Sequence, residues 1–444
     1  MLRRIMADKR FPSLPGFRDF APRDCAIRNY LFQAWRTVAR KYGFVEYEAP
    51  MVESTELYKK KAGEELNTQL FRFEDQGGRD ITLRPELTAS LARIVCAQQR
   101  DFPKPMKWFE IGPCFRYEAP QKGRGREFIQ FNADIIGEDS AGADAELIAL
   151  AIDTMLELGF TQEDFIIRAS DRESWIGFCA EKNIEDVAGF LQIIDKIERE
   201  KPDVLEEKLS AFGLSVSEVR AFIDDPNNAS ETFKAIQADL TARGMGEFLQ
   251  LDLTIVRGLA YYTGTVFEIF DTSRSMRAVA GGGRYNDLIS VVSNGAIDLA
   301  CTGFAMGDMV IRNFIEETSH ACMKMESWLM NQSPCEVYVM VADEQMRPEA
   351  LKLIGELRQH GVGVDFPLSA IKFNKQLKKA GEAHAKYALI IGSEFPEVKL
   401  KALAMRTEET LTADASLVPQ LLEKLTGVEA VSYTHLTLPT ICSV

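Results

Sequence analysis

The stretch 107-KWFEIGPCFRYEAPQKGRGREFIQFNADIIG-137 decides the fold of this chain. Two apolar, strand-like runs, 107–118 and 128–137, enclose a polar segment that is rich in glycine and basic residues. Two such runs joined by a short glycine-containing loop predict an antiparallel hairpin with a pliable connection. Arg116 and Glu118 stand where the first run ends, so we expect a cation and an acid beside the loop.

The segments around this hairpin show helix and strand periodicities. The expected helices are residues 24–42 and 141–160, and the expected strands are 44–53, 250–258 and 265–271. Residues 301–317 predict a strand that turns into a helix. From about 165 to 245, short helical runs with few strand patterns predict a helical insertion.

The C-terminal part alternates strand and helix patterns. The expected strands are 335–342, 362–366 and 387–392, and the expected helices are 347–361 and 370–384. This alternation predicts a parallel or mixed α/β domain, preceded by a linker within 318–334. The final residues, 431-VSYTHLTLPTICSV-444, carry no charge and resemble a translated sequencing adaptor, so we expect them to be non-native.

Composition narrows the class of protein. The 444 residues predict two or three domains, and no apolar run approaches the length needed to span a membrane. Eight scattered cysteines without a C-x-x-C pair argue against a disulfide framework or zinc ribbon and favour a reduced, cytoplasmic protein. The net charge of −14 argues against broad nucleic-acid binding, although a local basic groove on an acidic body remains compatible with RNA.

The four histidines, His320, His360, His384 and His435, all lie beyond residue 319. A histidine-based nucleophilic centre or a histidine-rich metal site is therefore nearly excluded from the region of the motifs. Chemistry there must use arginine, carboxylate, tyrosine and amide groups. No metal ligand is firmly assigned.

Three motifs together carry a family resemblance: 115-FRYE-118, 257-RGLAYYTG-264 and 281-GGGRY-285. The first resembles motif 2 of the class II aminoacyl-tRNA synthetases, and the other two resemble signatures of the histidyl-tRNA synthetases. The resemblance covers about residues 10–430. It implies an α+β fold in which an antiparallel sheet is flanked by helices, with a helical insertion and a C-terminal α/β anticodon-binding domain.

The resemblance also implies a division of the chain. A catalytic domain would span 1–322, with motif 1 at about 24–53, motif 2 at about 107–137, motif 3 at about 298–317 and the insertion at about 165–245. A linker would follow at 323–333, then the anticodon-binding domain at 334–430. Motif 1 builds a homodimer interface in the family; from the residues alone it is an amphipathic helix and an edge strand.

The implied activity is that of a histidine–tRNA ligase, which uses ATP and Mg²⁺ to convert L-histidine to histidyl-adenylate and loads it onto tRNA(His). The attacking carboxylate is already an anion and needs no general base, whereas the two approaching anions require fixed cations. Arginine suits this role because it stays charged and binds phosphate through two donors. The resemblance assigns it to Arg116 and Arg257.

The remaining site residues follow from the same resemblance. ATP would contact Arg116, Glu118, Arg124, Arg126 and Phe128. Histidine would contact Glu86, Leu87, Thr88, Gln130, Asp134, Tyr261, Tyr262 and Tyr285, together with Arg116 and Arg257. Neutral imidazole has one donor and one acceptor, so an acid with a tyrosine hydroxyl can recognise it; Asp134 and Tyr262 match these positions.

Taken without the resemblance, these motifs have plainer interpretations. The stretch 83-LRPELTASLAR-93 is also typical of a helix N-terminus with Pro85 and Glu86 in its first turn. The basic loop is typical of a solvated hairpin tip. The run 281-GGGRY-285 fits a turn before a helix or a weak phosphate loop.

Motif 3 departs from the family pattern. Val310 stands where an arginine for the γ-phosphate is usual, and Arg312, two residues further on, would point to another face of the helix. Asp308 could cap that helix. With Ala260 in place of the commoner aspartate, these changes resemble the branch that includes plant organellar enzymes. The γ-phosphate contact is left to Arg124 or Arg126.

Two alternatives share parts of this pattern. The regulatory subunit of ATP phosphoribosyltransferase is a non-catalytic histidine sensor with the catalytic fold, but it lacks the anticodon domain and usually degrades the RGLxYY signature. Synthetases for proline or threonine share motif 2 and the C-terminal domain type, but not 257-RGLAYYTG-264 with 281-GGGRY-285. The lysines 372, 375, 378 and 379 either face the anticodon stem or form a solvated helix face.

Overall fold

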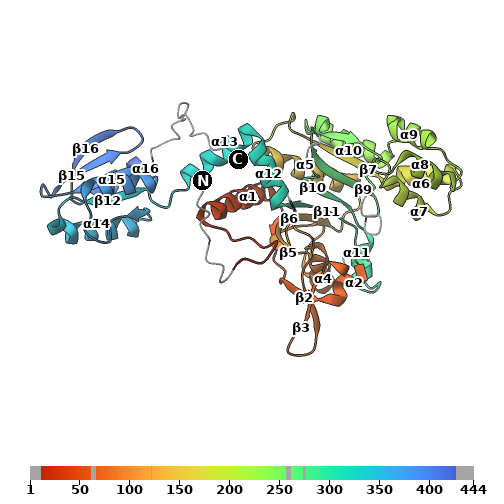
Figure 1. Ribbon diagram of the computed structural model, residues 1–444, viewed down its shortest axis with the longest axis horizontal. Helices are drawn as coiled ribbons and strands as arrows, with labels where there is room; N and C mark the ends of the chain where they lie inside the picture. The colour runs from red at the N-terminus through yellow and green to blue at the C-terminus, as the bar shows by residue number, and fades with distance from the viewer. Residues whose placement is uncertain (1–11, 62–66, 122, 257–261, 274–276, 427–444) are drawn as a thin grey trace, which may run out of the picture. The chain divides into compact units, whose positions relative to one another are not determined.

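The computed structural model describes residues 12–61, 67–121, 123–256, 262–273 and 277–426 (Figure 1). The chain divides into two compact units, Met1–Glu326 and Ser327–Val444. The described cysteines are all free thiols. Among the described helices, none combines the length and the apolar character that a membrane crossing requires. The predicted non-native tail lies outside the described residues.

An eight-stranded sheet, in the order β1-β5-β6-β11-β10-β9-β7-β8, organises the first unit. Its strands are β1 (Val45–Glu46), β5 (Met106–Phe115), β6 (Glu127–Ile136), β7 (Phe165–Asp171), β8 (Leu249–Leu251), β9 (Thr265–Asp271), β10 (Ala280–Arg284) and β11 (Cys301–Gly307). The two outermost strands, β1 and β8, pair in parallel with their neighbours, and all other pairs are antiparallel. The predicted hairpin is β5 and β6, which confirms the sequence interpretation.

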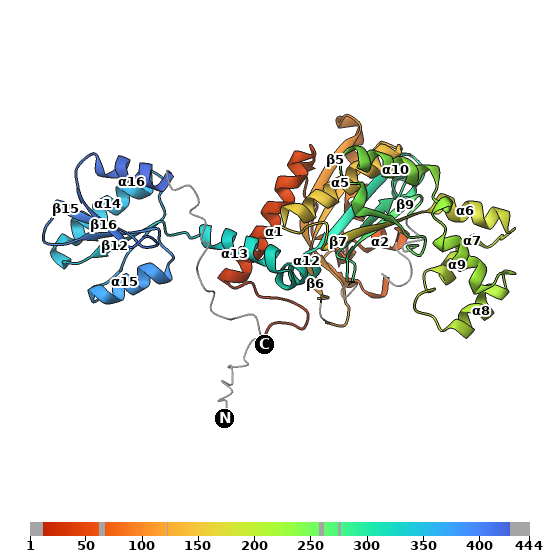
Figure 2. The ribbon, with the colours of Figure 1, turned by 90° about the horizontal axis from the view of Figure 1, so that it is seen from above.

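Helices pack against one face of this sheet (Figure 2). They are α1 (Pro22–Lys41), α5 (Ala141–Glu157) and α10 (Glu231–Ala242). Their apolar stripes meet the sheet through large side chains; Trp35 of α1 stacks on Phe131 of β6 with ring centroids 5.5 Å apart. Apolar side chains therefore cover this face of the sheet. The residues that alternate with Phe131 along β6 point to the opposite face.

A smaller assembly borders the opposite face. A three-stranded sheet in the order β2-β4-β3 and several short helices compose it. The elements are β2 (Val52–Ser54), α2 (Thr55–Lys61), β3 (Phe71–Glu74), β4 (Asp80–Leu83), α4 (Thr88–Gln98), the 3-10 helix η1 (Gln99–Asp101) and α11 (Asp287–Val292). Helix α4 begins after Pro85 and Glu86, so the prediction that these two residues form its first turn is wrong.

A helical subdomain with its own core interrupts the sheet between β7 and β8. Its helices are α6 (Arg172–Glu181), α7 (Val187–Ile194), α8 (Pro202–Ser210), α9 (Val216–Asp224) and the 3-10 helices η2 (Pro226–Asn228) and η3 (Gly246–Phe248). Trp175, Phe178 and Phe190 form an aromatic centre in this core. Residues 165–171 are strand β7 rather than part of the helical run, because their alternate side chains are buried in the sheet.

Two other local predictions are wrong for identifiable reasons. The expected strand 250–258 ends at Leu251, because the Asp252 carboxylate accepts hydrogen bonds from the backbone and hydroxyl of Thr254, at 3.0 and 2.6 Å, and turns the chain. The run 281–285 is not a turn before a helix: Gly281 to Arg284 lie in β10, in the middle of the sheet. An added Cβ at Gly282 would lie 2.4 Å from the Gly303 carbonyl oxygen, so close strand contact requires glycine there.

Motif 3 and the predicted linker are helical. Helix α12 (Asp308–Glu317) follows β11 directly, as predicted, and α13 (Ser319–Asn331) occupies most of 318–334. Ala321 and Met325 of α13 are buried, which explains why this stretch is ordered as a helix rather than extended.

The second unit is the mixed α/β domain predicted from sequence, with a five-stranded sheet in the order β13-β12-β14-β15-β16. Its elements are β12 (Val337–Val341), η4 (Glu344–Met346), α14 (Arg347–Gln359), β13 (Val364–Asp365), α15 (Phe373–Glu382), β14 (Tyr387–Ile391), β15 (Glu397–Ala402), β16 (Thr407–Thr412) and α16 (Leu417–Thr426). Strands β13, β12 and β14 are parallel, and β15 and β16 extend the sheet antiparallel.

Candidate active site

A floor of small residues occupies the middle of the open face of the main sheet. Gly281 and Gly283 of β10 pair with Ala305 and Gly303 of β11, and Gly307 continues the row along β11. Since residues two apart on a strand share a face, all five lie on the same side. No bulky side chain projects from these five positions.

Polar residues border this floor on both sides. Along β6, Gln130, Asn132 and Asp134 stand opposite Gly307, Ala305 and Gly303. On the other side, Glu268 of β9 stands opposite Gly281. The sequence interpretation named Gln130 and Asp134 but missed Asn132 and Glu268, although the period of two along each strand would have placed them on this face.

A buried acid–tyrosine pair lies at one end of the floor. The hydroxyl of Tyr285 donates a hydrogen bond to Asp134, and both residues are almost completely buried. Tyr262 packs against the same cluster as Tyr285. Burial, assisted by the charges of Glu86 and Asp134, raises the pKa of Tyr262 well above its ordinary value, so its hydroxyl stays a neutral donor.

Gly303 fixes the space beside this pair. An added Cβ there would lie 1.9 Å from Oδ1 of Asp134 and 3.1 Å from the Tyr285 hydroxyl. We expect Gly303→Ala to displace the Asp134 carboxylate and so to raise the KM for a small substrate bound beside it by roughly 10-fold or more, because a displacement of about 1 Å is costly in a preorganised site. Steady-state kinetics with each substrate varied in turn would measure it.

Gly177→Ala in α6 is the matched control, since nothing lies within 4 Å of an added Cβ there. It should leave both KM values unchanged. A Gly303→Ala variant with the same kinetics as this control would show that Asp134 does not depend on the glycine.

A second group of side chains precedes α4. Glu86 is half-buried, and its charge acts on both Tyr262 and Cys114, which places it beside the floor. The Thr88 hydroxyl accepts a hydrogen bond from Nδ2 of Asn132 at 3.2 Å, and Oε1 of Gln130 accepts one from the Cys114 thiol at 3.3 Å. The side chain of Leu87 is fully buried between them.

A buried ion pair supports the segment that carries Glu86. Arg84 and Glu110 are each 1% exposed, with Nη1 of Arg84 2.6 Å from Oε1 of Glu110. Arg84 also donates to the carbonyl oxygens of Ala49 and Pro113, at 2.8 and 2.9 Å. Sequence reasoning missed this pair; an arginine directly before Pro85 in an otherwise apolar context was the only signal.

The β5–β6 hairpin brings several cations to the other end of the floor. Arg116 donates from Nε to the Pro85 carbonyl oxygen at 2.9 Å, and its guanidinium lies 5.1 Å from the centre of the Phe128 ring. Arg124 pairs with Glu118 at 3.0 Å, and the Arg126 guanidinium lies 4.0 Å from the centre of the Tyr117 ring. The loop between the strands thus satisfies its own charges.

Motif 3 meets this loop through an apolar side chain. An added Cβ at Gly123 would lie 3.5 Å from Cγ2 of Val310, so Val310 does lie at the hairpin tip. Arg312 points elsewhere, as expected, and pairs with Asp24 and Glu316. Asp308 does not cap α12; its carboxylate binds Arg18 at 2.7 Å and the backbone N–H of Ile129 at 2.9 Å, because it faces the start of β6.

Arg284 of the glycine-rich motif is structural in character. It is 6% exposed, and its guanidinium binds the carboxylates of Asp144 and Asp139, each at 2.9 Å. This arginine joins β10 to the N-terminal end of α5 and holds Tyr285, its neighbour in sequence, in place. Arg257, Ala260 and Tyr261 lie outside the described residues.

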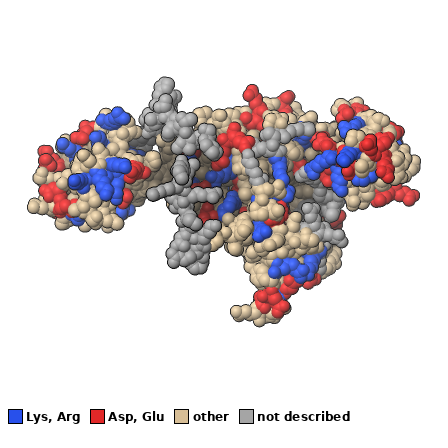
Figure 3. Space-filling model, viewed as in Figure 1, with Lys and Arg blue, Asp and Glu red and all other residues tan. Residues whose placement is uncertain are grey.

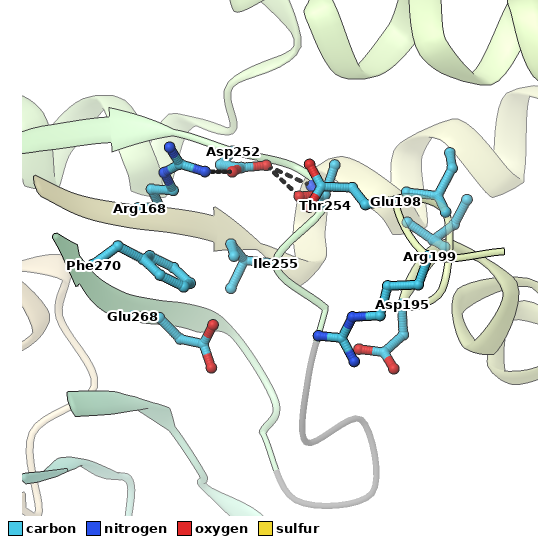
Figure 4. Close-up of a pocket in the computed structure, with 11 residues that line it drawn as sticks. Arg168, Asp195, Glu198, Arg199, Asp252, Thr254, Ile255, Glu268 and Phe270 are labelled. Carbon is cyan, nitrogen blue, oxygen red and sulfur yellow. Dashed lines mark hydrogen bonds and ion pairs between the residues drawn. The ribbon is translucent and has the colours of Figure 1, made fainter. Parts of the chain in front are cut away.

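A pocket of about 210 Å³ adjoins the floor beneath the helical subdomain (Figure 4). Arg168, Glu268 and Phe270 line it from the sheet, and Arg199 lines it from the subdomain. Nη1 of Arg168 lies 3.4 Å from the Asp252 carboxylate. Glu268 thus lies both at the border of the floor and in the lining of this pocket.

Comparison with known proteins gives consistent results. A family model described as histidyl-tRNA synthetase matches residues 16–309, and a second, described as an anticodon binding domain, matches residues 336–424. The histidine–tRNA ligase of Opitutus terrae is 39% identical over 424 residues, covering 90% of this chain and 95% of that protein. The chloroplastic/mitochondrial histidine–tRNA ligase of Arabidopsis thaliana is 35% identical, covering 88% of this chain and 82% of that protein.

Solved structures agree on the fold. The crystal structure of histidyl-tRNA synthetase from Nostoc sp. PCC 7120 superposes with a TM-score of 0.75, covering 93% of this chain and 99% of that one at 22% identity.

Proposed function

This chain belongs to the histidyl-tRNA synthetase family, and on that premise we propose that the glycine floor and its polar borders are where histidine is joined to ATP. The protein is a histidine–tRNA ligase, an aminoacyl-tRNA synthetase. The observation that carries the assignment of the site is the buried Asp134–Tyr285 pair at one end of the floor, with the arginine-bearing hairpin at the other. One end suits a small side chain with a donor and an acceptor, and the other suits phosphates.

In the activation step, a carboxylate oxygen of histidine forms a bond to the α-phosphorus of ATP. The bond from that phosphorus to the bridging oxygen breaks, and pyrophosphate leaves with the electron pair. Arg116 is suited to hold both anions, because its Nε is anchored on Pro85 while its other donors bind no group among the described residues. On the basis of its motif, we assign Arg257 the same role of holding the histidine carboxylate and the α-phosphate.

At the nucleotide end, Phe128 would stack on the adenine, and Glu118 would accept a hydrogen bond from its amino group. Glu118 is now paired with Arg124, so nucleotide binding would exchange that ion pair for the base. Mg²⁺ would neutralise negative charge on the phosphates of ATP. It prefers one or two carboxylates completed by phosphate oxygens and water, and in the described residues no three His, Cys, Asp or Glu groups converge, which fits an ion that arrives with ATP.

At the amino-acid end, Glu86, Thr88 and Gln130 would surround the α-ammonium group. Asp134 and Tyr262 would read the two imidazole nitrogens, and Tyr261 and Tyr285 would close the pocket. We expect Asp134→Ala and Tyr262→Phe to raise the KM for histidine by roughly 10²-fold, because an unpaired buried polar group discriminates strongly. The KM for ATP should change less than threefold in the same assay; equal losses for both substrates would refute imidazole recognition.

In the transfer step, a terminal hydroxyl of tRNA(His) would attack the activated carbonyl carbon and release AMP. Figure 3 shows basic side chains gathered on the second unit over α15, where Lys375, Lys378 and Lys379 are exposed. Together with Lys372 they form the surface that we propose for the anticodon stem. The second unit is the part matched by the anticodon-binding model.

We further propose a cytoplasmic homodimer formed through motif 1. Edge strand β1 and the chain after it carry exposed apolar side chains; Val45 is 63% exposed, Met51 49% and Val52 42%. We retain the domain bounds expected from the sequence, with the catalytic domain at 1–322, the linker at 323–333 and the anticodon-binding domain at 334–430.

Histidine-dependent ATP–pyrophosphate exchange, with the other amino acids as controls, tests this function. Exchange with histidine alone would establish it. Histidine binding without exchange would favour the alternative, a regulatory subunit of ATP phosphoribosyltransferase. That alternative has less support, because relatives at 33–39% identity over most of the chain are named as ligases.

A further inference from the structure

Among the described residues at the nucleotide end of the site, most of the arginines already have partners. Val310 occupies the motif 3 position that faces the hairpin tip. Four neighbouring arginines already have partners: Arg124 pairs with Glu118, Arg312 with Asp24 and Glu316, and Arg18 with Asp308, while Arg126 lies over Tyr117 and donates to the Glu118 carbonyl oxygen. Three of these arginines are paired with carboxylates, and of the three only Arg124 would be released when the adenine takes its place at Glu118.

Arg277 reaches the same hairpin tip from a distant part of the chain. Its Nη2 donates to Oε1 of Gln121 at 3.1 Å, and its side chain is exposed. The strand register explains its position: Arg277 precedes Ala280, which pairs with Met306 just before α12 begins. Arg277 therefore belongs to the end of the sheet where β11 gives way to the motif 3 helix.

The hairpin tip lies between Arg277 and Val310. Gln121 and Arg124 bond to each other through their backbones, at 2.9 and 3.1 Å, and so close the tip into a tight turn. Arg277 contacts this turn at Gln121, and Val310 lies against it at Gly123. A cation at 277 is thus held next to the place where the usual motif 3 arginine would act.

Arg277 has a neutral partner in the part of the chain that the structure describes. Its partner, an amide oxygen, is neutral, and within the described residues no carboxylate pairs with it. An arginine has five N–H donors, so one bond to Gln121 leaves most of the guanidinium for a ligand. Bonds from a charged donor to a charged acceptor are roughly twice as strong as neutral ones, so a polyphosphate is the favoured partner.

We propose that Arg277 binds the β- and γ-phosphates of ATP and supplies the charge that Val310 cannot. The inference rests on the proposed function of the site, since it presupposes that ATP lies at the hairpin end of the floor. Gln121 acts as a positioning residue, because it orients the guanidinium without meeting the phosphates.

Binding of ATP and of AMP to the full-length protein, measured by calorimetry, tests this. Arg277→Ala is expected to weaken ATP binding roughly 10- to 100-fold, the usual cost of a lost charged hydrogen bond, and to leave AMP binding unchanged because AMP lacks the terminal phosphates. Arg277→Gln removes the charge but keeps a donor for Gln121, and should lose as much as alanine. Arg220→Ala, on the exposed surface of α9, is the control and should bind both nucleotides normally.

Three outcomes would overturn the proposal: normal ATP affinity in Arg277→Ala, an equal loss of AMP affinity, or recovery of ATP affinity in Arg277→Gln. The last would show that Arg277 only positions the loop. Pyrophosphate exchange by the wild-type protein separates this test from the proposed function. If ATP binding depends on Arg277 but the wild-type protein shows no exchange, the ligase assignment is contradicted while the role of Arg277 stands.

Discussion

Replacing Arg116 by alanine is expected to lower kcat for histidine-dependent ATP–pyrophosphate exchange by roughly 10³-fold, the scale seen when a preorganised charge donor is removed from a transition state. The arginine lies at the end of β5, with one donor held by the Pro85 carbonyl oxygen and its plane near the Phe128 ring. It is only partly buried, and among the described residues no carboxylate pairs with it, so its removal should spare the fold.

Arg116→Lys is the informative companion variant. Lysine retains the charge but not the planar pair of donors, so it should recover only part of the lost rate. Circular dichroism and the midpoint of thermal unfolding should match the wild type in both variants. A wild-type exchange rate in a folded Arg116→Ala protein would remove Arg116 from the reaction.

The second large effect is on stability. We expect Arg84→Met to destabilise the first unit by about 3–5 kcal/mol at neutral pH, because it leaves the Glu110 carboxylate buried without its cation. The pair is 1% exposed at both ends. Chemical denaturation monitored by tryptophan fluorescence would measure the loss. Arg79→Met, which breaks an exposed pair with Asp75, should leave the unfolding midpoint nearly unchanged.

The loss should depend on pH. Burial raises the pKa of Glu110 above its ordinary value, and Arg84 opposes that rise. Without Arg84 the pKa climbs further, so between the ordinary carboxyl pKa of about 4.3 and the raised value the folded state holds a proton that the unfolded state releases. Stability of Arg84→Met therefore falls as pH increases through this window and recovers toward acid.

The double variant Arg84→Met, Glu110→Gln distinguishes this cause from simple loss of packing. It should regain much of the stability at neutral pH and lose the pH dependence. A single variant whose destabilisation is the same at pH 5 and pH 8 would contradict the role assigned to Glu110.

Much of the fold could be predicted because its elements are locally encoded. The β5–β6 hairpin combines two long apolar runs with a glycine-rich loop, and α1 and α5 carry continuous apolar stripes. Strand β10 could not be predicted this way. Three consecutive glycines are disfavoured in strands, and Gly282 and Gly283 are suited to this sheet because β11 and β9 approach too closely there for a side chain.

The sequence predicted the site residues that belong to a recognisable motif. Asp134, Tyr262 and Tyr285 were expected from their motifs, and the structure places them together, although their roles remain proposals. Sequence analysis missed the residues whose role depends on a partner far away in the chain. Arg84 matters because of Glu110, and Arg277 because it reaches Gln121, 156 positions away along the chain. Nothing local to either arginine marks it.

The floor of small residues on β10 and β11 has a consequence for how proteins of this fold could acquire different substrates. Because Gly281, Gly283, Gly303, Ala305 and Gly307 contribute almost only backbone, the surface that we propose beneath the bound amino acid carries little information about which amino acid it is. Discrimination must come from the surrounding strands and loops. A change of substrate during evolution would therefore require substitutions at the border, while the central strands, and the stability that they confer, could stay as they are.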